Sequence, residues 1–199
     1  MVVSQTHSLP IMDSREELRA LLLKNSVKRG DFTLASGKKS DLYVDCRTTT
    51  IHAKGALLIG ELCYQLVQET NRQLNVQPDS IGGMTLGADP ITLATAMESA
   101  RQSEENSLRP FVVRKEPKKY GMGSQIEGNF KEGDQVIVIE DTATTGGSAL
   151  KAIAAIEASG GKVAYVVVLV DREEGGLQNI EAAGYPVRSL YTRTQLFAE

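Results

Sequence analysis

Two adjacent carboxylates, Glu140 and Asp141, follow four consecutive β-branched apolar residues at positions 136–139. Such a run predicts a strand that is buried on both faces, as in a parallel sheet covered by helices. In open sheets of this kind, ligands bind at the carboxyl ends of the strands. The acidic pair is therefore a candidate for ligand binding and for catalysis.

The sequence Thr-Thr-Gly-Gly-Ser follows at positions 144–148, before a predicted helix at 149–156. Backbone N–H groups and hydroxyls at the start of a helix can bind a phosphate. The carboxylates would repel a phosphate, but they suit the vicinal hydroxyls of a ribose. The whole string predicts a ribose 5-phosphate site, and it matches neither the Walker pattern nor the dinucleotide fingerprint. The alternative is an ordinary strand, turn and helix with acids near a helix N-terminus.

Composition narrows the class of protein. The chain has 199 residues, 41% hydrophobic and 24% charged, which is typical of one globular domain. Its net charge of −3 gives no electrostatic reason to expect nucleic acid or a membrane surface as the main partner.

No apolar run approaches the roughly 20 residues of a membrane span. Residues 1–12 lack the features of a signal peptide and are expected to form an N-terminal arm. Cys46 and Cys63 lack metal-ligand spacing and fit a reducing cytoplasm.

Periodicity and turn residues predict the elements that position these groups. A capping box at 14–17 predicts a helix that ends near Gly30, and a hairpin is predicted over 31–47. Asp89-Pro90 predicts a capping acid and the start of a helix that runs through Met97. The other predicted elements are a helix at about 50–70 and strands near residues 81, 111, 137, 165 and 188. This alternation indicates an α/β fold with a central parallel sheet flanked by helices.

A basic segment lies at 114–128. Four of the six residues from 114 to 119 are basic, and glycines follow at 121, 123 and 128. A charge run is most often a solvated surface. A long polar connection with glycines is also typical of a mobile lid, and its charge is opposite to that of pyrophosphate.

The string at 136–148 closely resembles the phosphoribosyl pyrophosphate (PRPP) motif of type I phosphoribosyltransferases. Two further segments resemble orotate phosphoribosyltransferases in particular. The N-terminal signature matches at Phe32, Leu34, Ser36, Gly37, Ser40 and Tyr43, and the catalytic loop at Arg114, Lys115, Lys118, Tyr120 and Gly121. The resemblance covers about residues 14–195. It implies the type I phosphoribosyltransferase fold in a single domain, 1–199, with an arm at 1–12, a small N-terminal hood at about 13–47 and a core at about 48–199.

The resemblance also implies an activity. The 5-phosphoribosyl group of PRPP would pass to orotate, giving orotidine 5′-monophosphate and pyrophosphate in pyrimidine biosynthesis. Mg²⁺ would bind mainly through PRPP, with no dedicated protein metal site. The protein would be a homodimer in which the 114–128 loop of one subunit covers the site of the other.

Site residues follow from the same resemblance. The implied catalytic residues are Lys115, Lys118 and Asp141, and the implied orotate-binding residues are Tyr43, Thr144 and Arg172. An arginine suits bidentate binding of a carboxylate, although Arg172 could instead be a surface ion-pair partner. The implied PRPP-binding residues are Arg114, Lys115, Lys118, Tyr120, Glu140, Asp141, Thr142, Ala143, Thr144, Thr145, Gly146, Gly147 and Ser148.

The sequence departs from the family pattern in three places. Ala35 stands where many members carry a lysine that reaches the ligands, and Lys38 or Lys39 could compensate. Leu86-Gly87 replaces a frequent tyrosine-lysine pair, and Tyr120 replaces a histidine found in some members. Two alternatives stay open: a phosphoribosyltransferase for another base, and a regulator that senses PRPP without catalysis. The regulator would need an effector surface, such as a nucleic-acid-binding face, and the sequence shows none outside the lid.

Overall fold

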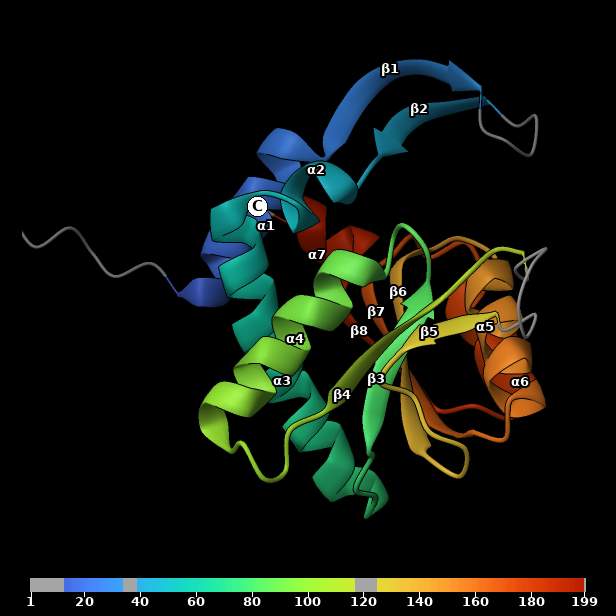
Figure 1. Cartoon of the computed structure of the whole chain (residues 1–199). Coiled ribbons are helices and arrows are strands. Elements are labelled where there is room, and N and C mark those ends of the chain that lie inside the picture. Colours follow the sequence, from blue (N-terminus) through green and yellow to red (C-terminus); the bar gives the residue numbers. More distant parts are fainter. Residues whose placement is uncertain (1–12, 34–38, 117–124, 199) are drawn as a thin grey trace, which may run out of the picture.

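The computed structural model describes residues 13–33, 39–116 and 125–198. Its centre is a six-stranded sheet in the order β5-β4-β3-β6-β7-β8, and a separate two-stranded sheet pairs β1 with β2 (Figure 1). The strands are β1 (Val27–Thr33), β2 (Lys39–Val44), β3 (Ser80–Met84), β4 (Arg109–Val113), β5 (Ile126–Gly128), β6 (Gln135–Ala143), β7 (Lys162–Asp171) and β8 (Val187–Thr192). The helices are α1 (Ser14–Asn25), α2 (Arg47–Thr50), α3 (Ala53–Leu74), α4 (Asp89–Gln102), α5 (Gly147–Ala158), α6 (Gly176–Ala182) and α7 (Arg193–Phe197).

The predicted α/β fold is confirmed, with one addition to the sheet. Strands β4, β3, β6, β7 and β8 are parallel, as expected from the alternation of strands and helices. The added strand, β5, pairs antiparallel with β4 at the edge. Its three residues are too few for periodicity to reveal, so the expectation of a purely parallel sheet was incomplete.

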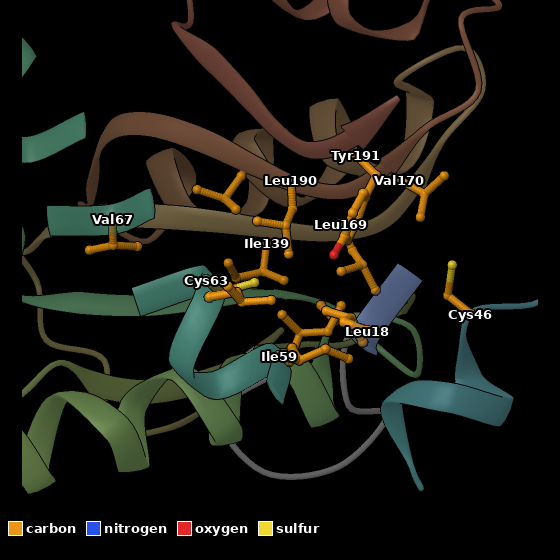
Figure 2. Close-up of a cluster of buried hydrophobic side chains, with 14 of the residues drawn as sticks. Leu18, Cys46, Ile59, Cys63, Val67, Ile139, Leu169, Val170, Leu190 and Tyr191 are labelled. Carbon is orange, nitrogen blue, oxygen red and sulfur yellow. The ribbon is translucent and has the colours of Figure 1, made fainter. Parts of the chain in front are cut away.

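Helices cover both faces of the sheet, with α3 and α4 on one side and α5 and α6 on the other (Figure 1). Strand β6 shows how the sequence builds these two layers. Val136 and Val138 pack in the cluster with α5, whereas Ile137 and Ile139 pack in the cluster with α3. Because successive side chains of a strand point to opposite faces, a fully apolar run is required wherever both faces are covered. Figure 2 shows Ile139 of the sheet beside Cys63 of α3, in the cluster that also contains Leu190 and Ile59.

Several predicted boundaries differ from the structure. Asp13, not Ser14, caps α1 by accepting from the backbone N–H of Arg15, so the predicted capping box is wrong. The Ser14 hydroxyl instead lies 3.2 Å from a carboxylate oxygen of Glu61 on α3. Helix α1 also ends at Asn25, not near Gly30, because the hairpin already begins at Val27.

One predicted helix start needed correction, and one short helix was not predicted. Asp89 is the first residue of α4 rather than its cap, and Ala88 holds the cap position without a side-chain hydrogen bond. Helix α7 had no counterpart among the predicted elements. It is held by a capping box between Thr192 and Gln195, a pattern too short to stand out in the sequence.

The hairpin β1–β2 stands apart from the main sheet, over the edge at which the parallel strands end (Figure 1). Within the same N-terminal region, α1 packs into the main core through Leu18 and Leu22. The arginine side chains of α1 also bind the C-terminal segment: Arg19 donates to the carbonyl of Leu196 at 2.9 Å and to that of Ala198 at 2.8 Å. These contacts hold α1, which directly precedes the hairpin, against the main core and the C-terminal segment. Among the described residues, no helix has the length and apolar character needed to cross a membrane.

Candidate active site

The acidic pair occupies the last part of β6, where the strand leaves the core. Glu140 is only 8% exposed and still pairs in the sheet with Val168 of β7. Its Oε2 atom is buried and has no hydrogen-bond partner among the described residues. Because an unpartnered buried carboxylate oxygen is costly, the atom is suited to receive a hydrogen bond from a ligand.

The two carboxylates change each other's protonation. Burial, followed by the charge of Asp141 and hydrogen bonding to it, raises the pKa of Glu140 to about 8. Burial also raises the pKa of Asp141, while hydrogen bonding from Glu140 and the charge of Arg47 oppose that rise. Two carboxylates in contact cannot both ionise at low cost. Burial and the closeness of the two carboxylates therefore favour one shared proton over two negative charges.

The turn after β6 is shaped for a small anion. Gly146 caps α5 with φ 76°, and a Cβ there would lie 2.8 Å from the carbonyl oxygen of Gly176. Glycine is therefore required by both backbone conformation and space. Asn179 of α6 donates to the carbonyl of Thr145 at 3.0 Å, which fixes the turn from the other side. The first N–H groups of α5 remain for a ligand such as phosphate.

The hairpin and α2 supply the opposite wall. The rings of Tyr43 and Phe32 pack with centroids 5.5 Å apart. Thr142 of β6 donates to the sulfur of Cys46 at 3.3 Å, and burial raises the pKa of that thiol to about 12. Cys46 thus joins the start of α2 to the acidic strand as a neutral thiol.

The loop between β3 and α4 lies directly against the acidic pair. A Cβ on Gly87 would lie 2.6 Å from the carboxyl carbon and Oδ1 of Asp141. The absence of a side chain at 87 therefore lets the loop backbone approach the carboxylate. This closeness gives a physical reason for the glycine at a position where the family pattern often has lysine.

Arg172 directly follows β7, and both its backbone and its side chain make contacts that hold it in place. Its backbone N–H donates to the carbonyl of Ala143 at 3.0 Å, and its guanidinium pairs with Glu174 at 2.7 Å. The residue is 7% exposed, and its buried Nε has no partner in the described part of the chain. The neighbouring Glu173 has φ 57° and accepts from the N–H of Thr194 at 2.9 Å, so α7 anchors this loop.

These elements enclose a polar hollow of about 310 Å³. Its walls come from the hairpin, the β3–α4 loop, the acidic end of β6, the turn before α5 and the loop after β7. Its described lining is Tyr43, Val44, Asp45, Cys46, Arg47, Met84, Thr85, Leu86, Gly87, Lys115, Glu140, Asp141, Thr142, Thr144, Ser148 and Arg172.

Most of the described residues expected at the site line this hollow. Three others lie differently: Arg114 pairs with Glu127 at 2.6 Å, Ala143 packs in the core beneath α5, and Lys39 begins β2 without lining the hollow. Thr145, Gly146 and Gly147 form the turn beside it. The expectations for Lys38, Lys118 and Tyr120 lie outside the described residues.

Sequence reasoning missed Asp45, Cys46 and Arg47, which line the hollow next to Tyr43. The spacing Asp-x-Arg at the end of a predicted hairpin was the available signal. That signal is weak, because a charged pair after a strand is usually solvated. A contact between α2 and β6, which are far apart in the sequence, cannot be read from either segment alone.

The fold and this hollow define the class of the protein as a type I phosphoribosyltransferase. A search of family models matches none to the chain. The chain is 48% identical to the orotate phosphoribosyltransferase of Aquifex aeolicus, over 94% of this chain and 99% of that protein. It is 43% identical to the corresponding protein of Rhodopirellula baltica, over 88% and 90% of the two chains. The chain belongs to the orotate phosphoribosyltransferase family.

A solved structure supports the same assignment. The orotate phosphoribosyltransferase of Mycobacterium tuberculosis, in complex with PRPP, superposes with a TM-score of 0.77 at 37% identity. The match covers 94% of this chain and all of the other.

Proposed function

We propose that the chain transfers the 5-phosphoribosyl group from PRPP to orotate, giving orotidine 5′-monophosphate and pyrophosphate in the biosynthesis of UMP. One observation carries the proposal most directly. A single hollow is lined by the carboxylates of Glu140 and Asp141, by Thr144 and Ser148 of the turn before α5, and by the buried Arg172. Those three features fit the ribose diol, the 5′-phosphate and the carboxylate of the base respectively.

The acidic pair supports the central step. As the bond from C1 to the leaving oxygen lengthens, positive charge develops on the ribose and negative charge on pyrophosphate. Glu140 and Asp141 accept hydrogen bonds from the ribose hydroxyls. The negative charge of the pair stabilises the positive charge that develops on the sugar. Thr144, Ser148 and the first N–H groups of α5 hold the 5′-phosphate, so the anomeric carbon is fixed relative to the base.

The other walls hold the base and the leaving group. Arg172 binds the carboxylate of orotate through its guanidinium, and Tyr43 and Thr144 contact the base. Lys115, in the wall, and Lys118 of the lid neutralise pyrophosphate as it departs.

Mg²⁺ enters with PRPP in this proposal. The described residues contain no cluster of three or more His, Cys, Asp or Glu side chains that could hold a metal ion. Two adjacent carboxylates and a threonine-rich turn suit a cation that keeps most of its ligands as phosphate oxygens and water. Bound to the diphosphate, the ion would supply charge neutralisation of the leaving group.

A homodimer is proposed from the surface of α3 and α4. Exposed apolar side chains lie on both helices: Leu57 on α3, which is 73% exposed, and Leu93 and Met97 on α4. Between the two helices lies an apolar hollow of about 380 Å³, lined by residues such as Ala56, Leu57 and Met97. A patch of this kind marks an interaction surface, and a two-fold contact pairs it with itself. In that dimer, the loop at 114–128 is proposed to cover the partner's site.

The proposed setting is a reducing cytoplasm. Cys46 and Cys63 are both free and buried, and burial raises the pKa of each thiol to about 12. Neutral buried thiols act as small apolar groups and need no oxidising environment.

The proposal is tested by measuring pyrophosphate release from PRPP and Mg²⁺ with orotate, uracil, adenine, guanine and hypoxanthine. Turnover with orotate alone is expected. Turnover with another base would show a phosphoribosyltransferase of different specificity, and tight PRPP binding without turnover would show a PRPP sensor. In the same assay, Arg172→Ala should raise the KM for orotate by tenfold or more, because a carboxylate that loses a buried cationic partner loses roughly 2–5 kcal/mol. The KM for PRPP should change less.

A further inference from the structure

Arg47 is a cation in the wall of the active site for which the chemistry described so far gives no role. It is the first residue of α2 and lines the same hollow as the acidic pair and the β3–α4 loop. Its side chain is 47% exposed, so a ligand can reach it. The described cations of this hollow are Arg47, Lys115 and Arg172.

The guanidinium of Arg47 is held in one plane by Asp45. Nε lies 2.8 Å from Oδ1 and Nη2 lies 2.8 Å from Oδ2, a two-point ion pair. Oδ1 also accepts from the backbone N–H of Arg47 at 3.1 Å, which fixes the carboxylate against the start of α2. Nη1 has no partner among the described residues, so one edge of a pre-oriented guanidinium remains for a ligand.

The position of Arg47 favours one part of the substrate. Both Arg47 and Gly87 neighbour Asp141: the charge of Arg47 opposes the burial-driven rise in the pKa of Asp141, and Gly87 lies against the carboxylate. Arg47 therefore lies where the acidic pair meets the β3–α4 loop. The 5′-phosphate has its own place at the turn before α5, and Arg172 is available for the base. The remaining anionic group of PRPP is its diphosphate.

We propose that Arg47 binds the diphosphate of PRPP, with Asp45 as a positioning residue that orients the guanidinium. This inference rests on the proposed function. Nη1 donates to a diphosphate oxygen, and the positive charge stays with the leaving group as pyrophosphate forms. An arginine is suited to this role because it is always charged and donates in a fixed geometry.

The alternative is that Arg47 only satisfies Asp45 and stabilises α2. Calorimetric titration separates the two roles, using PRPP, pyrophosphate and ribose 5-phosphate at one Mg²⁺ concentration without orotate. Arg47→Ala should weaken PRPP and pyrophosphate about tenfold or more, since a hydrogen bond to a charged group is lost. Ribose 5-phosphate, which lacks the diphosphate, should change less than about twofold. Arg47→Lys should recover part of the loss because it keeps the charge but not the two-point pairing.

Two control variants complete the test. Asp45→Asn keeps an oxygen that can accept from the backbone N–H of Arg47 but removes the ion pair, so it should weaken PRPP binding much less than Arg47→Ala. Arg72→Ala removes an exposed charge near the far end of α3 and should leave all three affinities unchanged. Unchanged PRPP binding by Arg47→Ala, or equal weakening of all three ligands, would overturn the inference. A wild-type protein that does not bind PRPP at all would overturn the proposed function as well.

Discussion

Glu140 shows how burying a carboxyl group in a binding site can lower the stability of the folded protein as the pH rises. Its pKa is raised from 4.5 to about 8, first by burial and then by Asp141. Between those pH values the folded protein holds a proton that the unfolded chain releases, so the contribution to stability is full below about pH 4.5 and is lost as the pH rises through 8. The free energy of unfolding should therefore fall with pH in this window.

Glu140→Gln should remove that fall, because glutamine keeps the shape but cannot ionise. At pH 8 its free energy of unfolding should exceed that of the wild type by about 2–4 kcal/mol, and at pH 5 the two should be similar. Denaturant unfolding at a series of pH values measures the difference. Glu181→Gln, which replaces an exposed carboxyl on α6, is the matched control and should follow the wild type. Parallel curves for Glu140→Gln and wild type would show that the buried pair does not share a proton.

The residue types in the sequence indicate which chemical groups the site could bind, but they do not predict the contacts between its side chains. Adjacent carboxylates before a hydroxyl-rich turn predict a site for a ribose and a phosphate, because each residue type has few compatible ligands. The shared proton and the Asp45–Arg47 pair were not predictable, since both depend on burial and on distances between segments. The described hollow includes Arg47 but not Lys39, one of the two lysines expected to compensate for Ala35.

At the scale of elements, the β3–α4 loop and β6 act as one unit. Gly87→Ala would place a methyl group within 2.6 Å of the Asp141 carboxyl, and the carboxylate would have to move. Because the displaced group is a side-chain end, stability should change little, whereas PRPP affinity should fall by roughly tenfold through misplacement of a ligand-binding group. Calorimetry with PRPP measures this effect. In an Asp141→Ala background the same substitution should have little further effect, and additive losses would contradict the contact.

The long apolar strands and α3 were predictable because their periodicity is strong. The ends of elements were not. Helix α1 stops five residues before the predicted glycine because Val27 pairs with Val44 in the hairpin, a long-range contact that local pattern does not contain. The short β5 and α7 depend on neighbours in the same way.

At the scale of the whole molecule, the exposed face of α3 and α4 makes assembly testable. Leu57→Asp with Met97→Asp places two charges in the apolar patch and should convert a dimer into monomers, measured by sedimentation or light scattering. Gln178→Asp, on the exposed surface of α6, is the control and should leave the dimer intact. A wild-type monomer, or a double variant that still dimerises, would contradict the proposed interface.

Sharing of the lid is tested by mixing Lys118→Ala and Asp141→Ala subunits. In a mixed dimer of a two-fold assembly, one site has both an intact lid and an intact acidic pair, and the other has both defects. With random exchange about half of the dimers are mixed, so activity should recover to roughly a quarter of wild type. If subunits exchange and no activity returns, the lid acts within its own chain.

The most direct test of the site is a crystal structure with orotidine 5′-monophosphate. The phosphate should lie at the turn formed by Thr144 to Ser148, the ribose hydroxyls on Glu140 and Asp141, and the carboxylate of the base at Arg172. That arrangement would confirm the orientation from which every proposed role follows. A nucleotide bound outside this hollow, or one with its phosphate at Arg172 and its base at the turn, would contradict it.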